Sequence, residues 1–252
     1  MNPLQHPQEI YEFLHEIEAG AVLDVATGIG QFASILGDCL KSYDEIIGID
    51  THPRAIELAT EQVNLPNVSF QVADALALPF LSKRFDTVAI SNSLHHMKAL
   101  PKVLLEMQRV TVANGRWIVF EMHSDAPNQS SQNAIDLHLW AAASDRAMGR
   151  FHAPVYSRAE LMKAIQSLQL EDLRTMDWHS DEEPTHEQIE GSIQAIDSVR
   201  AQARETTEGD ALSAAADDLI ERIRTQGIQS QPFILATGRL PESSDSSNPI
   251  LW

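Results

Sequence analysis

The chain has 252 residues, of which 43% are apolar, and this is enough for one large α/β domain or two small ones. Its 18 basic residues against 36 acidic ones leave a formal net charge of −18, without any visible cluster of lysine and arginine. Such a chain repels a phosphate backbone, so we expect no nucleic-acid partner.

Cysteine content and hydropathy indicate where the protein works. Cys39 is the only cysteine, so no disulfide can form within the chain, and this favours a reducing compartment. No N-terminal run resembles a signal peptide, and no apolar run approaches the roughly 20 residues needed to span a bilayer. We therefore expect a cytoplasmic protein without a membrane span. The sequence carries no signal for an oligomeric state.

A glycine turn near the N-terminus is the first functional signal. Residues 7–18 have the spacing of a short amphipathic helix, and the apolar run 21–25 that follows predicts a buried strand. Gly28 and Gly30 come next, and a helical pattern starts at Gln31. This order brings backbone N–H groups and the positive end of a helix dipole to a ligand, and glycine allows a close approach.

Three further apolar runs end in polar residues. The runs 45–49, 68–72 and 85–90 predict strands, and they lead to Asp50, Asp74 and Asn92. Asp50 lies 22 residues after Gly28, about where a nucleotide-binding unit places the carboxylate for the ribose hydroxyls. Because parallel strands end at the same edge of a sheet, we expect these side chains to line one ligand site.

The remaining pattern continues the alternation of helices and strands. Ser157 with Glu160, and Thr185 with Gln188, form capping boxes that predict two helix starts. The chain after Pro241 is rich in serine and aspartate and is predicted to be disordered. The other predicted elements are helices at 31–40, 53–63 and from Pro101, strands at 116–121, 170–178 and 231–237, a turn at Asn114-Gly115, and a helix that ends at Gly227.

Five segments, in order, resemble the class I S-adenosylmethionine-dependent methyltransferases, in the ubiquinone/menaquinone-type (methyltransferase type 11-like) branch. They are VLDVATGIGQFA, IIGIDTHPRAIELA, FQVADALALPF, FDTVAISNSLHHM and NGRWIVFEMH. The resemblance is close over residues 22–123 and loose over the last 130. The family often has Asp-x-Gly-x-Gly-x-Gly, whereas this chain has Ala26 at the first glycine.

The resemblance implies a Rossmann-like, doubly wound α/β fold with a mostly parallel seven-stranded sheet whose last strand is antiparallel. One domain would cover residues 1–240, with helical additions near the C-terminus, and 241–252 would be the disordered tail. The additions at 124–156 and 181–227 would form a substrate cover. The implied activity is in-line methyl transfer from S-adenosylmethionine to a small-molecule acceptor.

The same resemblance assigns the cofactor site. Asp24 would face the amino group of the methionine part, Asp50 the ribose, and Asp74 with Ala75 the adenine. The alternatives are purely structural roles: a helix cap for Asp24 and for Asp50, and an Asx turn for Asp74. The predicted cofactor-binding residues are Asp24, Ala26, Gly28, Gly30, Asp50, Thr51, Asp74, Ala75 and Asn92.

Histidines after two adjacent strands are the predicted catalytic residues. His96 and His123 fall on the binding edge and titrate near neutral pH, which suits a general base for an acceptor that must lose a proton. A purely structural role for His95 and His96 is the alternative. We do not predict a metal site from His96, His123 and His152, because no metal-ligand spacing motif supports it.

Two rival functions remain open. The segment GIGQFA also fits the dinucleotide fingerprint G-x-G-x-x-A, so an NAD-dependent oxidoreductase is one alternative. Three features argue against an oxidoreductase: Asp24, the Asp74-Ala75 pair and the lack of a Tyr-x-x-x-Lys dyad. The other alternative is a non-catalytic cofactor-binding subunit whose acidic C-terminal half docks a partner.

Overall fold

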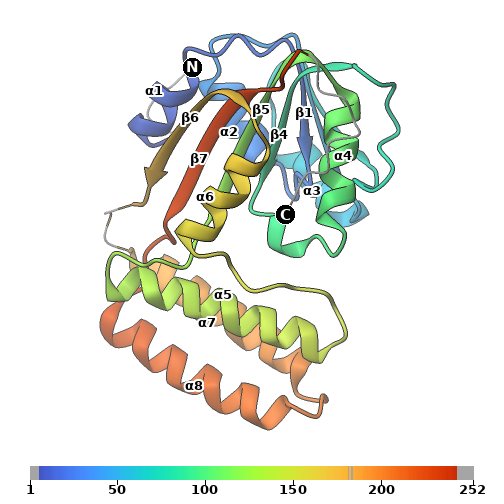
Figure 1. Cartoon of the computed structure of the whole chain (residues 1–252). Helices are drawn as coiled ribbons and strands as arrows, with labels where there is room; N and C mark the ends of the chain where they lie inside the picture. Colours follow the sequence, from blue (N-terminus) through green and yellow to red (C-terminus); the bar gives the residue numbers. More distant parts are fainter. Residues whose placement is uncertain (1–5, 181, 183, 243–252) are drawn as a thin grey trace.

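The computed structural model describes residues 6–180, 182 and 184–242 (Figure 1). At its centre lies a seven-stranded sheet of order β3-β2-β1-β4-β5-β7-β6. β1 to β5 run parallel, and β7 is antiparallel to both of its neighbours. The predicted fold class is therefore confirmed. The strands are β1 (Ala21–Val25), β2 (Glu45–Asp50), β3 (Val68–Val72), β4 (Phe85–Ser91), β5 (Thr111–Met122), β6 (Glu171–Trp178) and β7 (Phe233–Arg239).

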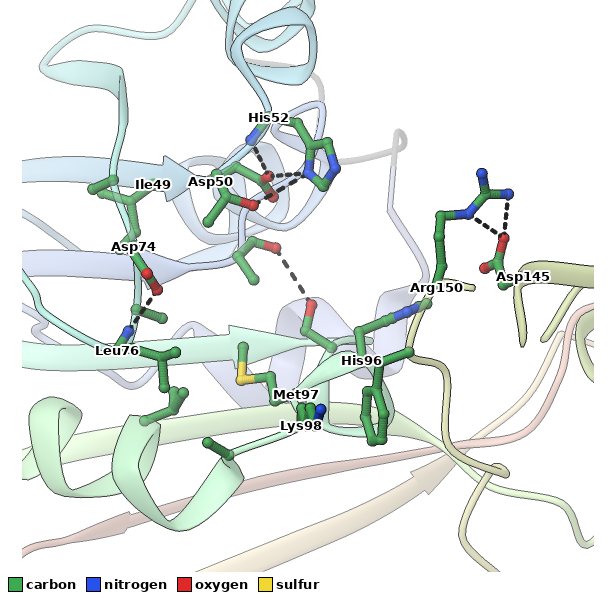
Figure 2. Close-up of a pocket in the computed structure, with 18 residues that line it drawn as sticks. Ile49, Asp50, His52, Asp74, Leu76, His96, Met97, Lys98, Asp145 and Arg150 are labelled. Carbon is green, nitrogen blue, oxygen red and sulfur yellow. Dashed lines mark hydrogen bonds and ion pairs between the residues drawn. The ribbon is translucent and has the colours of Figure 1, made fainter. Parts of the chain in front are cut away.

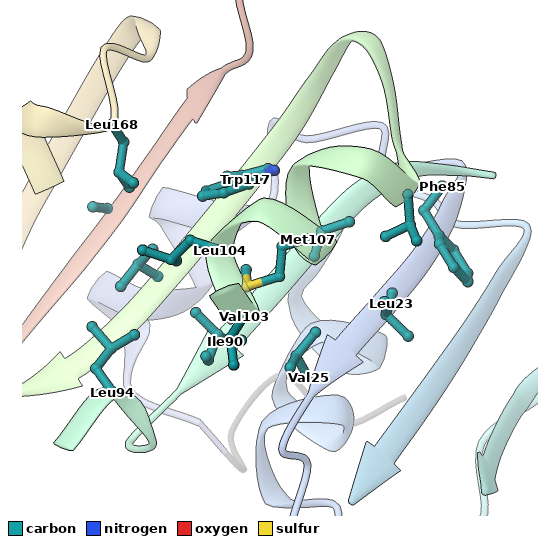
Figure 3. Close-up of a cluster of buried hydrophobic side chains, with 14 of the residues drawn as sticks. Leu23, Val25, Phe85, Ile90, Leu94, Val103, Leu104, Met107, Trp117 and Leu168 are labelled. Atoms are coloured by element: carbon teal, nitrogen blue, oxygen red, sulfur yellow. The ribbon is translucent and has the colours of Figure 1, made fainter. Parts of the chain in front are cut away.

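Helices cover both faces of the sheet. Along β1, Leu23 and Val25 join an apolar cluster with residues of α4 (Leu100–Val110) and α6 (Arg158–Ser167), shown in Figure 3. Val22 points the other way, into a cluster with α1 (Gln8–Leu14) and α2 (Gln31–Cys39). All five residues of β1 are therefore buried, as expected for a parallel strand between two helical layers. α3 (Pro53–Gln62) packs beside β2 and β3.

Two predicted boundaries differ from the structure. β5 starts at Thr111 rather than 116, because the Asn114-Gly115 turn is a bulge inside the strand: Asn114 has φ 58°, and the register with β4 jumps between Phe85 and Thr87. α1 ends at Leu14 rather than 18, because the chain there turns into a bridge between Glu18 and Ser42.

Three helices form a separate layer beyond the carboxyl ends of the parallel strands (Figure 1). They are α5 (Gln129–Ala147), α7 (His186–Ala203) and α8 (Gly209–Gln226), and they share their own apolar cluster. Within it the buried indole Nε1 of Trp140 donates to the carbonyl oxygen of Leu212 at 2.9 Å. This layer is built from the two segments that the sequence marks as additions, 124–156 and 181–227.

Both predicted capping boxes are present, at Ser157/Glu160 and at Thr185/Gln188. Apart from Pro241 and Glu242, the tail predicted to be disordered lies outside the described residues. In the described ranges, none of the helices combines the length and apolar character that crossing a bilayer requires.

The cluster shared by α5, α7 and α8 predicts a stability effect. Ile223 is fully buried there, and Ile223→Ala should lower the free energy of unfolding by about 2–5 kcal/mol, because it leaves a cavity in a packed core. Leu139 on α5 is 37% exposed, so Leu139→Ala is the matched control and should cost well under half as much. Urea denaturation measures both, and equal losses would show that the layer is not packed as described.

Candidate cofactor and acceptor site

A cavity of about 1000 Å³ lies at the carboxyl ends of the first four strands (Figure 2). It is at the upper end of the size range of small-molecule sites, so it has room for more than one small ligand. It also lies where the strand order reverses between β1 and β4, which is the usual binding crevice of open α/β sheets. Its walls comprise Ala26, Ile49–His52, Ala73–Leu76, Ser93, His96–Ala99, Val103, Asp145, Arg150 and Phe151.

The glycine loop after β1 has a left-handed backbone at three positions. Ala26, Gly28 and Gly30 have φ of 56°, 55° and 83°. A Cβ at Gly30 would lie 2.9 Å from Cγ2 of Val63, whereas a Cβ at Gly28 would meet no atom within 4 Å. Gly28 therefore presents bare backbone to open space. Ala26 adopts a conformation that costs an ordinary residue roughly 1–2 kcal/mol, so the departure from the family's glycine leaves strain at the cavity wall.

Asp50 ties this loop to the end of β2. Its Oδ2 accepts from the backbone N–H of Gly28 at 3.0 Å, and its Oδ1 accepts from the backbone N–H of His52 at 2.9 Å. Each carboxylate oxygen can accept more than one hydrogen bond. Because Asp50 also lines the cavity, it can still accept from a ligand hydroxyl while it holds the loop in place.

Asp24 is a fully buried carboxyl with one unused oxygen. Thr27 Oγ1 donates to Oδ2 at 2.5 Å, while Oδ1 has no hydrogen-bond partner in the described part of the chain. Burial raises the pKa of Asp24 to about 7. The hydrogen bond from Thr27 and the backbone of Ala33 act to lower this pKa, and the charge of Asp50 raises it further. An orphaned, half-titrated carboxyl suits a cationic or donor group of a ligand.

Some of the predicted cofactor residues line the cavity and others do not. Asp74 forms an Asx turn, with the backbone N–H of Leu76 donating to its Oδ1 at 2.8 Å, yet Asp74, Ala75 and Thr51 also line the cavity. Of the predicted set, Asp24, Gly28, Gly30 and Asn92 are not in the lining, and Asn92 adopts a left-handed φ of 43°.

His96 lines the cavity and belongs to a group of four histidines. Its ring centroid lies 4.3 Å from that of His95 and 4.1 Å from that of His152, and His138 packs against all three. Loss of solvent around its ring at the cavity wall, together with the charges of His95 and His152, lowers the pKa of His96 to about 4, although the residue as a whole is exposed. Burial and the neighbouring histidines lower the pKa of His138 to about 3. These two rings are therefore uncharged at neutral pH.

The structure does not bring His123 to His96. The backbone N–H of His123 donates to the carbonyl oxygen of Pro232, just before β7, so His123 lies beside the start of β7, which pairs with β5 on the side away from β4. Its Nδ1 accepts from the backbone N–H of Asp125 at 3.3 Å, and its Nε2 lies 4.0 Å from Asp177 Oδ1. His123 is buried and is not among the residues that line the cavity.

Sequence reasoning overlooked several residues around this site. Asp145 on α5 contacts His152 Nδ1 at 2.9 Å through Oδ2 and accepts from Arg150 at 2.6 Å through Oδ1. His138 and Asp145 lie seven residues apart, two turns along one helix face, and this spacing was the available signal. Buried Glu121 on β5 accepts at Oε2 from the backbone N–H groups of Ser93 and Leu94, at 3.0 and 2.9 Å, and so fixes the turn that carries His95 and His96.

Comparison with known proteins decides the family. A model of the family described as "Methyltransferase domain" matches residues 18–177, well over half of the chain. The chain belongs to this methyltransferase family. The match confirms the resemblance drawn from the five sequence segments.

Relatives of this methyltransferase-domain protein include members of the ubiquinone/menaquinone-type branch that the sequence resembles. A "Ubiquinone/menaquinone biosynthesis C-methyltransferase UbiE" from Geotalea uraniireducens is 34% identical over 108 residues, 41% of this chain and 46% of the relative. A "Probable tocopherol O-methyltransferase, chloroplastic" from rice (Oryza sativa subsp. japonica) is 33% identical over 171 residues, 65% of this chain and 46% of the relative. The chain thus spans about half the length of the curated relatives it matches.

A solved structure confirms the fold of the methyltransferase-domain protein. The YcgJ protein from Bacillus subtilis superposes with a TM-score of 0.59 at 19% identity, covering 94% of this chain and all of that one. No comparison supports the oxidoreductase alternative.

The raised pKa of Asp24 predicts a pH dependence of stability. The folded chain holds this proton more tightly than the unfolded chain, whose pKa is near 3.8. Stability from this group is therefore complete below about pH 4 and is lost as the pH rises to about 7. Asp24→Asn carries no titrating group at this position and should not lose stability in this way. The unfolding free energy of the variant minus that of the parent should therefore rise by up to roughly 4 kcal/mol between about pH 4 and pH 7. Denaturant titrations at several pH values measure this, and a difference that stays constant with pH would contradict it.

Proposed function

We propose that the protein transfers the methyl group of S-adenosylmethionine to a small-molecule acceptor bound in the same cavity. One observation carries the proposal: three carboxyl groups stand near the ends of consecutive strands, Asp24 with an orphaned buried oxygen near the end of β1, and Asp50 and Asp74, which line the cavity, at β2 and after β3. S-adenosylmethionine has an ammonium group, ribose hydroxyls and an adenine amino group, which are hydrogen-bond donors in the same order. Family membership supports the same reading.

The same carboxylates disfavour a dinucleotide. NAD would bring a diphosphate to the glycine loop, but the N–H of Gly28 already donates to the Asp50 carboxylate, and Asp24 lies at the foot of the loop. Residues 26–30 contain no lysine or arginine to balance the added charge. An anion there would meet like charges, whereas the cationic methionine part of S-adenosylmethionine would not.

The chain's part in the reaction is binding, orientation and exclusion of water. When bound, the cofactor supplies a methyl group on a positively charged sulfur, and the acceptor's lone pair displaces the neutral thioether in line. Asp24 and the bare backbone at Gly28 would hold the methionine part, and Asp50 and Asp74 the nucleoside. Fixing both reactants in one cavity removes much of the entropic barrier to such a displacement.

The acceptor side of the cavity combines apolar side chains with the Asp145–Arg150 ion pair. Met97 and Val103 come from the segment after β4, and Phe151, 47% exposed, comes from the segment after α5. We propose that the layer of α5, α7 and α8 acts as the substrate cover, since Asp145 of α5 and the following Arg150 and Phe151 line the cavity, while α7 and α8 pack against α5. The relatives' names refer to ubiquinone, menaquinone and tocopherol, so ring compounds of that kind are the first acceptors to test.

We assign the acceptor contact to His96, because His96 lines the cavity and His123 does not. Its pKa of about 4 replaces the near-neutral value expected from the sequence, so the uncharged ring can accept a proton but is a weaker base than an ordinary histidine. The cytoplasmic location and the absence of a nucleic-acid partner stay predictions that rest on the single cysteine and the net charge of −18.

Cofactor binding is tested by Asp50→Ala, which removes a carboxylate from both the ribose site and the loop. Binding of S-adenosylhomocysteine, measured by calorimetry, should weaken by roughly 1.5–3 kcal/mol, about 10- to 150-fold in Kd, because charge-assisted hydrogen bonds are lost. Glu61→Ala, an exposed acidic residue of α3, is the matched control and should bind normally. Unchanged affinity in Asp50→Ala, or binding of NAD(H) in place of S-adenosylhomocysteine, would contradict the assignment.

Methyl transfer is tested with tritiated cofactor against ring hydroxyl compounds and a metabolite extract, with mass spectrometry of the labelled product. Once an acceptor is found, His96→Ala should lower kcat or raise the acceptor KM at saturating cofactor, by roughly the 10²-fold or more typical of a lost proton-transfer group if the acceptor loses a proton. His123→Ala, checked for folding by circular dichroism, should keep both constants. The reverse pattern would place the acceptor on the β7 side of the sheet, and failure to label any acceptor would favour the non-catalytic alternative.

A further inference from the structure

We infer that His95, His96 and His152 form a binding site for one divalent transition-metal ion in the wall of the cavity. Each residue offers one ring nitrogen, and the three nitrogens lie within 4.8 Å of one another. Of these three residues only His96 has a part in the proposed methyl transfer, as the acceptor contact, and ion binding can be measured whether or not methyl transfer is found.

The backbone holds the three rings together although they come from distant parts of the chain. His95 and His96 lie in the short turn Leu94–His96 after β4, and His152 follows α5. The backbone N–H of Ala153 donates to the carbonyl oxygen of His95 at 2.9 Å, which joins the two segments beside the rings. The turn itself is fixed by the buried carboxylate of Glu121. A site with such supports loses little entropy when an ion binds.

His95 gives the clearest sign of a missing ligand. Its side chain is 1% exposed, and neither ring nitrogen has a hydrogen-bond partner in the described part of the chain. Nδ1 lies 3.2 Å from Glu121 Oε1, but the pair is too poorly aligned for a hydrogen bond. A buried polar group without a partner is costly, and a bound cation would supply one.

His152 is already oriented as a metal ligand would be. Asp145 Oδ2 contacts its Nδ1 at 2.9 Å, which directs Nε2 toward the other histidines. Metal-binding histidines commonly use the second ring nitrogen in this way, and the carboxylate sets the tautomer of the ring. Nε2 now contacts His138 Nε2 at 3.1 Å, so an ion would replace that contact.

The donor set selects the type of ion. Three imidazoles without a carboxylate ligand suit zinc, nickel, cobalt or copper and disfavour magnesium and calcium, which prefer oxygen. Zinc–nitrogen bonds of about 2.0–2.1 Å in a tetrahedron place ligand nitrogens roughly 3.4 Å apart, so the rings must close by about an ångström or more. His96 is exposed to the cavity and has room to rotate. Three protein ligands leave a fourth position, and because His96 lines the cavity, that position faces it.

Metal titration of the full, untagged chain tests this proposal. After treatment with a chelator, Zn²⁺ should bind at one ion per chain by calorimetry, and Co²⁺ should give the visible absorption of a four-coordinate site. His96→Ala and His152→Ala should each weaken Zn²⁺ binding at least 10-fold and abolish the Co²⁺ spectrum. His96→Ala is the safer variant for folding, because its side chain is exposed.

His186→Ala is the matched control, since His186 is an exposed histidine at the start of α7, outside the cluster. It should keep the parent's affinity and stoichiometry. Failure of Zn²⁺ to bind, or binding that the cluster variants do not weaken while circular dichroism shows them folded, would overturn the proposal and leave the four histidines as packing. Methyl transfer measured in the parent and in His152→Ala, a residue with no part in the proposed reaction, fails or succeeds separately from Zn²⁺ binding, so the two proposals are distinguishable.

Discussion

A parallel sheet covered by helices on both faces leaves only its strand ends for polar chemistry. β1 is buried along its whole length, so a charged side chain on that strand must stand at its end or find a partner inside. Asp50 stands at the end of β2, where it holds the glycine loop, and Asp24 accepts a hydrogen bond from Thr27 near the end of β1. The position of the cavity follows from this constraint, because the loops that carry these residues all emerge on the same side.

The loop between β1 and α2 shows how such a site is assembled from short-range contacts. Gly28 supplies an N–H group that Asp50 accepts, and Gly30 lies too close to Val63 for any side chain. Ala26 keeps the same left-handed backbone without being glycine. The surrounding sheet therefore maintains a local strain at the point where a ligand would approach, which is a common feature of binding loops.

The parts of the site that were predictable are those that local sequence determines. Strand, turn and helix follow each other within about 20 residues around Gly28, so their spacing in the sequence is enough to predict the shape of the loop. The placement of Asp50 needed only the parallel pairing of β1 with β2. His123 was different, because its side depends on Pro232 and β7, more than a hundred residues later in the chain. The same is true of His138 and Asp145, which reach His96 only through the packing of α5 across the strand ends.

Turn signals were also ambiguous for a physical reason. Asn114 and Gly115 favour positive φ, and both a hairpin and a strand bulge use that conformation. The sequence therefore located the irregularity but not its type. The role of Glu121 could not be predicted, because a glutamate at the end of a strand is normally expected to be exposed. In the structure it is buried, and its carboxylate accepts from the N–H groups of Ser93 and Leu94.

The layer of α5, α7 and α8 has an apolar cluster separate from the two that flank the sheet. Its stability therefore depends mainly on residues that do not touch the strand-end carboxylates. Over evolutionary time, mutations could reshape this layer, and with it one wall of the cavity, while the glycine loop and Asp50 stayed unchanged. The same separation makes the layer a natural unit for protein engineering: exchanging it between related enzymes would be a direct way to alter which molecules are admitted.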